Sequence, residues 1–125
     1  MLRLYRSPIS ARDIVMNTHQ MELMKGTLDL LVLKTLAIEP RHGVGIADRI
    51  EQVTRGAFQV RPGSLFPALH RLEQDGFIRG EWSETPGGHR AKYYRITAAG
   101  RRQLTHEKRN WARIVLAIGQ ILAER

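Results

Sequence analysis

The chain contains no cysteine, so it can form no disulfide and no thiolate metal site, and it offers no thiol nucleophile. Long apolar runs are missing as well: the longest, at 30–33 and 114–118, are far too short to cross a bilayer. The first residues (1–13) lack the apolar core of a signal peptide. We therefore expect a cytoplasmic protein without a membrane partner.

Acidic residues are scarce relative to basic ones. The chain has 12 Asp and Glu against 20 Lys and Arg, which gives a formal net charge of +8. At this length such an excess implies a positive potential over much of the surface, and polyanions are its natural partners. A chain of 125 residues has room for one core and its appendages, but not for separate cofactor and substrate domains.

Patterns that carry catalysis or bind metals are also missing. The five histidines are dispersed, without ligand spacing or clustered carboxylates, so we expect no metal site and no cofactor. Ser64 follows Gly63, but no nucleophile elbow surrounds it. Gly43 and Gly45 are not followed by the Lys and Ser of a phosphate-binding loop. A small enzyme is therefore a disfavoured alternative.

Two helices are predicted where organised patterning begins, at about residue 25. Apolar residues at spacings of three and four from Thr27 to Ile38 indicate a nearly fully buried helix, which Pro40 stops. A narrower apolar stripe over 46–53 indicates a second helix with a charged outer side. We interpret 58–60 as a short strand.

A third helix is predicted to follow, with Ser64 as its N-cap. Leu65, Leu69 and Leu72 lie at positions i, i+4 and i+7 and give this helix an apolar inner face. With this start Pro67 falls in the first turn, where its missing N–H costs nothing. The outward face is expected to carry hydrogen-bond donors suited to phosphates or base edges: Ser64, His70, Arg71 and Gln74.

Two strand-like segments, 77–83 and 91–97, come next, and the turn residues Pro86, Gly87 and Gly88 lie between them. They predict a β-hairpin with a mobile tip. The tip and second strand contain no acidic residue, and their basic residues are His89, Arg90, Lys92 and Arg95. Each phosphate that this hairpin neutralises would release counterions and add about one unit to the slope of log affinity against log salt.

Thr97 is predicted to cap a final helix that runs from Ala98 to the end, with Gly100 as a weak position. Its apolar residues form a heptad-like seam that packs either onto the chain's own first helix or against a second copy. Because the helix extends well beyond the hairpin, we expect at least Trp111 onward to pair between subunits. The expected interface consists of Leu104, Trp111, Ile114, Val115, Ile118, Ile121 and Leu122.

Three helices followed by a hairpin is the order of a winged helix-turn-helix, a mainly α fold with a small β-hairpin wing. Two helices brace the third, whose outer face can enter a major groove about 12 Å wide. We expect a loosely ordered extension at 1–24, a DNA-binding domain at 25–97 and a C-terminal dimerisation helix at 98–125.

Four blocks of the sequence resemble the PadR family of transcriptional regulators, especially its short members with one C-terminal helix. GSLFPALHRLE at 63–73 and RAKYYRIT at 90–97 are highly specific in this order and separation. GTLDLL at 26–31 and HGVGI at 42–46 support them. The likeness covers about residues 24–122.

The resemblance implies a winged-helix homodimer that binds operator DNA and usually represses transcription. Family members commonly have Tyr where this chain has Val44 and Phe66, so either the affinity is lower here or Lys25, Arg71 and the wing compensate. By position, the residues that resemble the family's DNA contacts are Lys25, Ser64, Phe66, Pro67, His70, Arg71, His89, Arg90 and Lys92.

Some relatives bind small aromatic or cationic molecules between their last helices, where a Trp stacks on the ligand. The resemblance therefore makes Trp111 a candidate ligand-binding residue, and a multidrug or phenolic-compound sensor is the alternative function. Trp111 is interpreted equally well as an anchor of the dimer core. A winged helix that binds protein or RNA is disfavoured, because the tip is basic and exposes no large apolar side chains.

Overall fold

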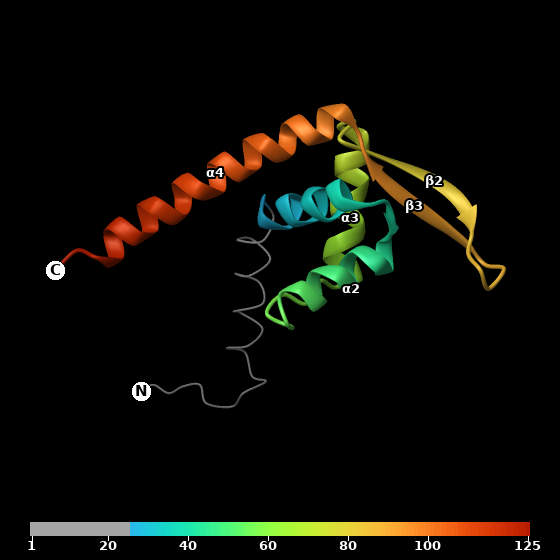
Figure 1. Cartoon of the computed structure of the whole chain (residues 1–125), viewed down its shortest axis with the longest axis horizontal. Helices are drawn as coiled ribbons and strands as arrows, with labels where there is room; N and C mark the ends of the chain where they lie inside the picture. The colour runs from blue at the N-terminus through green and yellow to red at the C-terminus, as the bar shows by residue number, and fades with distance from the viewer. Residues whose placement is uncertain (1–25) are drawn as a thin grey trace.

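The structure is a computed structural model that describes residues 26–125. Three helices and a hairpin pack into one body, from which the last helix projects to one side and the hairpin to the other (Figure 1). The elements are a first helix at 26–38, β1 (Arg41–His42), α2 (Gly43–Val53), α3 (Pro62–Gln74), β2 (Ile78–Glu84), β3 (Arg90–Ile96) and α4 (Ala98–Leu122). The predicted mainly helical fold with a hairpin wing is confirmed, whereas the extension predicted at 1–24 and the contact predicted at Lys25 lie outside the described residues.

The hydrophobic core joins the first helix, α2, α3, the hairpin and the start of α4. Leu33, Ile46 and Leu69 are almost completely buried, and each such side chain contributes about 1.5–3 kcal/mol by leaving water. Leu104, on α4, belongs to this core and is only 8% exposed. Its predicted place in a dimer interface is therefore wrong: the sequence could not show that the first two turns of α4 pack onto their own domain.

The sheet differs from the prediction at two places. The segment 58–60 is not a strand; Phe58 and Val60 pack against the core without ladder partners. Instead β1 adds to the hairpin in the order β1-β3-β2, with Arg41 opposite Tyr94 and His42 opposite Tyr93. A two-residue strand is too short to leave an alternating pattern, which is why the sequence predicted no strand there.

The helix α3 begins earlier than predicted, at Pro62, and Arg61 takes the N-cap position without a side-chain cap. Ser64 is therefore not the N-cap, since its backbone N–H already bonds to the Arg61 carbonyl at 3.0 Å. Proline suits the first helical position because its φ is already helical and its missing N–H has no partner to lose. Pro67 then lies inside the helix and leaves the carbonyl of Gly63 without its usual donor.

The start of α4 is fixed by two contacts. The hydroxyl of Thr97 accepts a hydrogen bond from the Gly100 N–H at 3.0 Å, which confirms the predicted cap, and it donates one to the Gly76 carbonyl at 2.6 Å. Gly100 is buried, and a Cβ at this position would collide with the backbone oxygen of Phe77. The glycine is thus needed for close packing and is not the weak position that we predicted.

Gly100→Ala is expected to lower the free energy of unfolding by about 1–3 kcal/mol, because the backbone of Phe77 has to move. Gly119→Ala is the matched control in the same helix. Nothing lies within 4 Å of a Cβ at Gly119, so we expect this change to stabilise by roughly 0.5–1 kcal/mol. Urea denaturation at one protein concentration measures both, and equal midpoints for the two variants would contradict the assignment.

Candidate nucleic-acid interface

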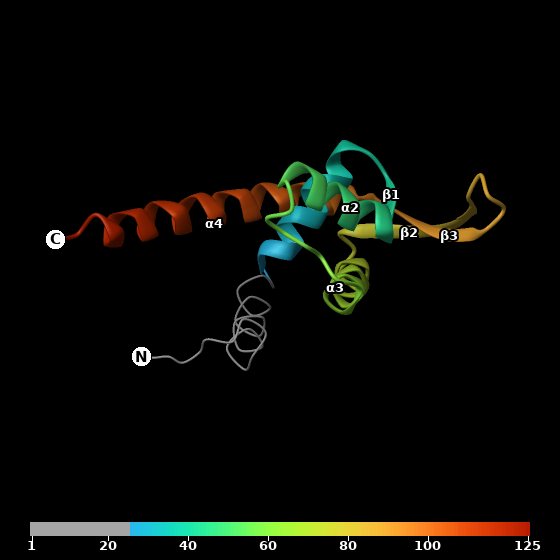
Figure 2. The same ribbon diagram turned by 90° about the horizontal axis from the view of Figure 1, so that it is seen from below.

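The outer face of α3 is exposed on one side of the domain, and its inner face is buried as predicted. Figure 2 shows α3 end-on, beneath the hairpin, at one edge of the domain. Phe66, at 46% exposure, and Pro67 make the first half of the outer face apolar, while the second half is polar. The exposed residues are Gly63, Phe66, Pro67, His70 and Gln74, with Ser64 partly exposed at one flank.

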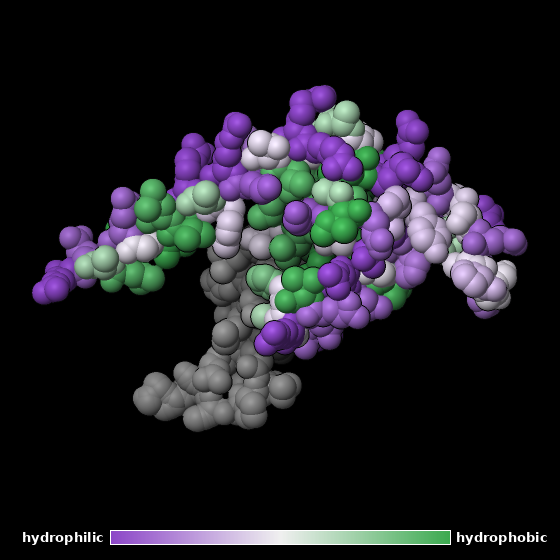
Figure 3. All heavy atoms as spheres, viewed as in Figure 1, coloured by the Kyte–Doolittle hydropathy of each residue, from purple (hydrophilic) through white to green (hydrophobic). Residues whose placement is uncertain are grey.

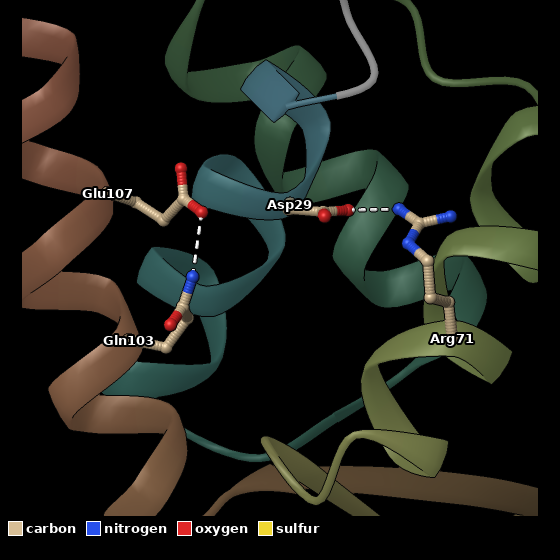
Figure 4. Close-up of polar contacts among 4 residues, drawn as sticks. All are labelled: Asp29, Arg71, Gln103 and Glu107. Carbon is tan, nitrogen blue, oxygen red and sulfur yellow. Dashed lines mark hydrogen bonds and ion pairs between the residues drawn. The ribbon is translucent and has the colours of Figure 1, made fainter.

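Arg71 does not lie on this outer face. Its guanidinium is directed to the first helix, where it pairs with Asp29 across 2.5 Å between Nη2 and Oδ1 (Figure 4). The expectation that Arg71 faces outward is therefore wrong. Helical periodicity places Arg71 only at the flank of α3, and the partner that turns it inward is 42 residues away in sequence.

Asp29 lies between α3 and α4. Burial raises the pKa of its carboxyl above the usual aspartate range, Arg71 opposes this shift, and Glu107 on α4 adds to it. Glu107 in turn accepts a hydrogen bond from Gln103 at 2.8 Å (Figure 4). The first helix thus separates α4 on one side from α3 on the other, and Asp29 is influenced by charges on both.

Lys92 is also paired rather than free. Its ammonium lies 3.0 Å from Oε1 of Glu73, and the hydrogen bond to Glu73 raises the pKa of Lys92. The second carboxylate oxygen of Glu73 accepts from the Gly80 N–H at 3.3 Å. One carboxylate on α3 therefore ties both strands of the hairpin to this helix, and Lys92, predicted as a DNA contact of the wing, is already paired within the domain.

Three other basic side chains, on the hairpin and at the start of α3, have no acidic partner among the described residues. His89 and Arg90 are exposed on the hairpin, as predicted, and the Arg90 guanidinium lies 5.2 Å from the ring centre of Trp82. Arg61 is exposed at the beginning of α3. Sequence reasoning missed Trp82, although its strand position was known, and missed Arg61 because it placed the helix start three residues too late.

The distal half of α4 projects away from the rest of the described chain (Figure 1). From Trp111, at 45% exposure, every residue of the helix is exposed. Figure 3 shows a group of hydrophobic side chains over this half of α4, bordered by hydrophilic ones. The large apolar residues exposed here are Trp111, Ile114, Val115, Leu116, Ile118, Ile121 and Leu122. All predicted interface residues except Leu104 are thus available to a partner.

Within residues 26–125, no helix is both long and apolar enough to span a membrane. The same part of the chain brings together no group of three His, Asp or Glu side chains able to hold a metal ion.

Three packed helices with an exposed third member, followed by a hairpin tied to it, define a winged helix-turn-helix DNA-binding protein. The sequence model of the Transcriptional regulator PadR-like family matches residues 32–106, so the chain belongs to this family. It is accordingly a DNA-binding transcriptional regulator and not an enzyme.

Individual relatives agree with this assignment. The chain is 35% identical over 88 residues to Transcriptional regulator Rv3488 of Mycobacterium tuberculosis, covering 70% of this chain and 78% of that protein. It is similar to a PadR family transcriptional regulator from Eggerthella lenta, with a TM-score of 0.75, 29% identity and coverage of 92% and 98% of the two chains. A PadR family regulator from Clostridium difficile matches with a TM-score of 0.66 at 30% identity, covering 76% and 97%.

Proposed function

We propose that the protein is a homodimeric repressor that acts in the cytoplasm on a palindromic operator. The observation that carries the proposal is the distal half of α4, whose large apolar side chains are exposed while the other described elements build a shared core. Exposed apolar side chains of this number on one helix face are unusual for a monomer. A second copy covers them with the same residues, as two-fold pairing requires.

The seam supports a helix-to-helix dimer. Trp111 and Ile118 are seven residues apart and fall on nearly the same side of α4, with Ile114 and Ile121 beside them. Two-fold pairing along this seam would present two α3 helices to half-sites about 34–36 Å apart, one turn of B-DNA. A palindromic operator follows from that symmetry.

The proposed contacts divide by chemistry. Phe66 and Pro67 are apolar and suit thymine methyl groups, while His70 donates or accepts hydrogen bonds. Arg71 and Lys92, held by carboxylates, act as positioning residues for α3 and the wing. Direct contacts are assigned to Ser64, Phe66, Pro67, His70, Gln74, His89 and Arg90, and Lys25 remains a predicted contact.

A gel shift with the DNA just upstream of the protein's own gene tests the proposal. We expect a shifted complex of two chains per duplex whose affinity falls steeply with salt. Transcription in vitro from the same DNA should decrease as the protein is added. A single protomer in sedimentation, or the absence of any salt-sensitive binding to duplex DNA, would contradict the proposed function.

A second candidate function is effector sensing, for which the 45% exposed ring of Trp111 could stack on a ligand between the two α4 helices. Trp82 is the only other tryptophan in the chain, so the Trp82→Phe variant leaves Trp111 as the sole indole. If planar phenolic acids or cationic drugs bind between the α4 helices, they should quench this fluorescence saturably through ring stacking. The Trp111→Phe variant controls for quenching elsewhere, and a linear response in both would dismiss the sensor.

A further inference from the structure

We propose that Trp82 and Arg90 form a further contact site for duplex DNA on the wing. The indole would pack against deoxyribose at the edge of the minor groove, and the guanidinium would enter that groove. This inference rests on the DNA-binding function proposed above, which already assigns Arg90 as a contact. It adds Trp82 as an aromatic contact beside Arg90 and names the groove that the pair would meet.

Trp82 lies outside the hydrophobic core of the domain. It is 60% exposed and is absent from the core, whereas Tyr94, on the same side of the hairpin, is 7% exposed and buried in it. A tryptophan can remove 150–250 Å² from water when it is covered, a gain that this side chain largely forgoes in the free protein. Its exposed area is therefore available for binding.

The strand register places Trp82 on the side of the hairpin that faces α3. Trp82 is opposite Lys92, and Gly80 is opposite Tyr94, so these side chains share one face. Glu73 of α3 contacts both Gly80 and Lys92 on that face. Trp82 thus follows directly after the point where the recognition helix holds the hairpin.

The orientation of the hairpin favours a DNA contact through its strands rather than through its tip. Figure 2 shows α3 on one side of β2 and β3, while the turn at the tip bends toward the other side. A duplex that takes α3 into its major groove would therefore meet the α3-facing side of the strands before the tip. This is the side that carries Trp82.

Arg90 keeps its charge unneutralised on the same face. Glu84 is directly opposite Arg90 in the register, yet the guanidinium lies over the Trp82 ring, 5.2 Å from its centre. Stacking of this kind orders a flexible side chain and leaves its N–H groups free to donate. An ordered arginine loses less entropy on binding and suits the negative potential of a narrow minor groove.

Of the other cations on the hairpin strands, Lys92 and Arg95 each have an acidic partner, whereas Arg79 has none among the described residues. Lys92 pairs with Glu73, and Arg95 lies 3.6 Å from Glu81 on the opposite face. Arg79 is exposed, but it belongs to that opposite face, since it is paired in register with Arg95. On the α3-facing side of the strands, Arg90 is therefore the free cation among the described residues.

Fluorescence tests the contact directly. The Trp111→Phe variant leaves Trp82 as the sole indole, and we expect operator DNA to reduce its quenching by acrylamide at least threefold. The Trp82→Phe variant, which reports on Trp111, should show the same quenching with and without DNA. Phenylalanine keeps an aromatic ring at either position, so both variants are expected to keep the fold and the dimer, which far-ultraviolet circular dichroism and sedimentation check.

Affinity and groove preference complete the test. Trp82→Ala should weaken operator binding about tenfold without changing the salt slope, whereas Arg90→Ala should also reduce that slope by about one unit. The parent should prefer an operator with A·T-rich flanks over one with G·C-rich flanks, and Arg90→Ala should lose this preference.

The two possible failures can be told apart. If the parent binds the operator but Trp82→Ala binds equally well and the Trp82 indole stays open to acrylamide, the contact site is wrong and the regulator function stands. If the parent itself binds no duplex DNA, the proposed function fails first.

Discussion

Replacing Ile118 with arginine is expected to turn the dimer into a monomer and to weaken operator binding at least a hundredfold. Ile118 lies in the middle of the apolar side of α4 and is 53% exposed in the single chain. Two-fold pairing would bring two arginines close together in an apolar interface, where unpaired charge is costly. A monomer would also lose the gain in affinity from binding two half-sites at once.

Leu116→Arg provides the matched control for this prediction. Leu116 is 64% exposed, two residues away in the same helix, but it points to the side opposite the seam. Both substitutions place an arginine at an exposed position of the single chain. A difference between their effects would therefore come from pairing between two copies. Sedimentation should find Leu116→Arg dimeric and Ile118→Arg monomeric; the same state for both would show that this side of α4 is not the interface.

Replacing Arg71 with alanine is expected to destabilise the domain by about 1–3 kcal/mol, because it leaves the carboxylate of Asp29 without its partner. Burial already raises the pKa of Asp29, and the loss of Arg71 would raise it further. An acid whose folded-state pKa is raised costs stability once the pH is high enough to ionise it. The deficit of the variant should therefore be small in acid and grow as the pH rises through the folded-state pKa of Asp29 toward neutral.

Asp29→Asn is the control for this pair, since asparagine cannot ionise but keeps an oxygen that accepts from a donor. The double variant should recover part of the stability lost by Arg71→Ala, which a double-mutant cycle in urea measures. Operator binding gives the second readout. A positioning role predicts weaker binding with an unchanged salt slope, whereas a slope reduced by about one unit would identify Arg71 as a direct phosphate contact.

The sequence was sufficient to predict elements that rest on local chemistry. The apolar spacing of Leu65, Leu69 and Leu72 predicted the buried side of α3, and the hydroxyl of Thr97 marked the start of α4. The turn around Gly87 and Gly88 located the hairpin to within one residue at each end. In each case the residues that decide the structure are neighbours along the chain.

The wrong predictions concern contacts between distant residues. Whether Arg71 faces outward depends on Asp29, and whether Lys92 is free depends on Glu73, 19 residues away. Leu104 and Trp111 belong to one heptad pattern, yet only Leu104 is covered by its own domain. Periodicity gives the side of a helix on which a residue lies, but the tertiary packing decides what that side meets.

The isolation of the distal half of α4 also has a mechanical consequence. Its length of about twelve residues corresponds to roughly 18 Å, and every one of these residues is exposed. If the distal halves of two α4 helices tilted by about 10° where they cross, each α3 helix would move by roughly 3 Å. This is close to the rise of one base pair. In a dimer joined in this way, small changes in how the two α4 helices pack would alter the fit of both α3 helices to their half-sites at once.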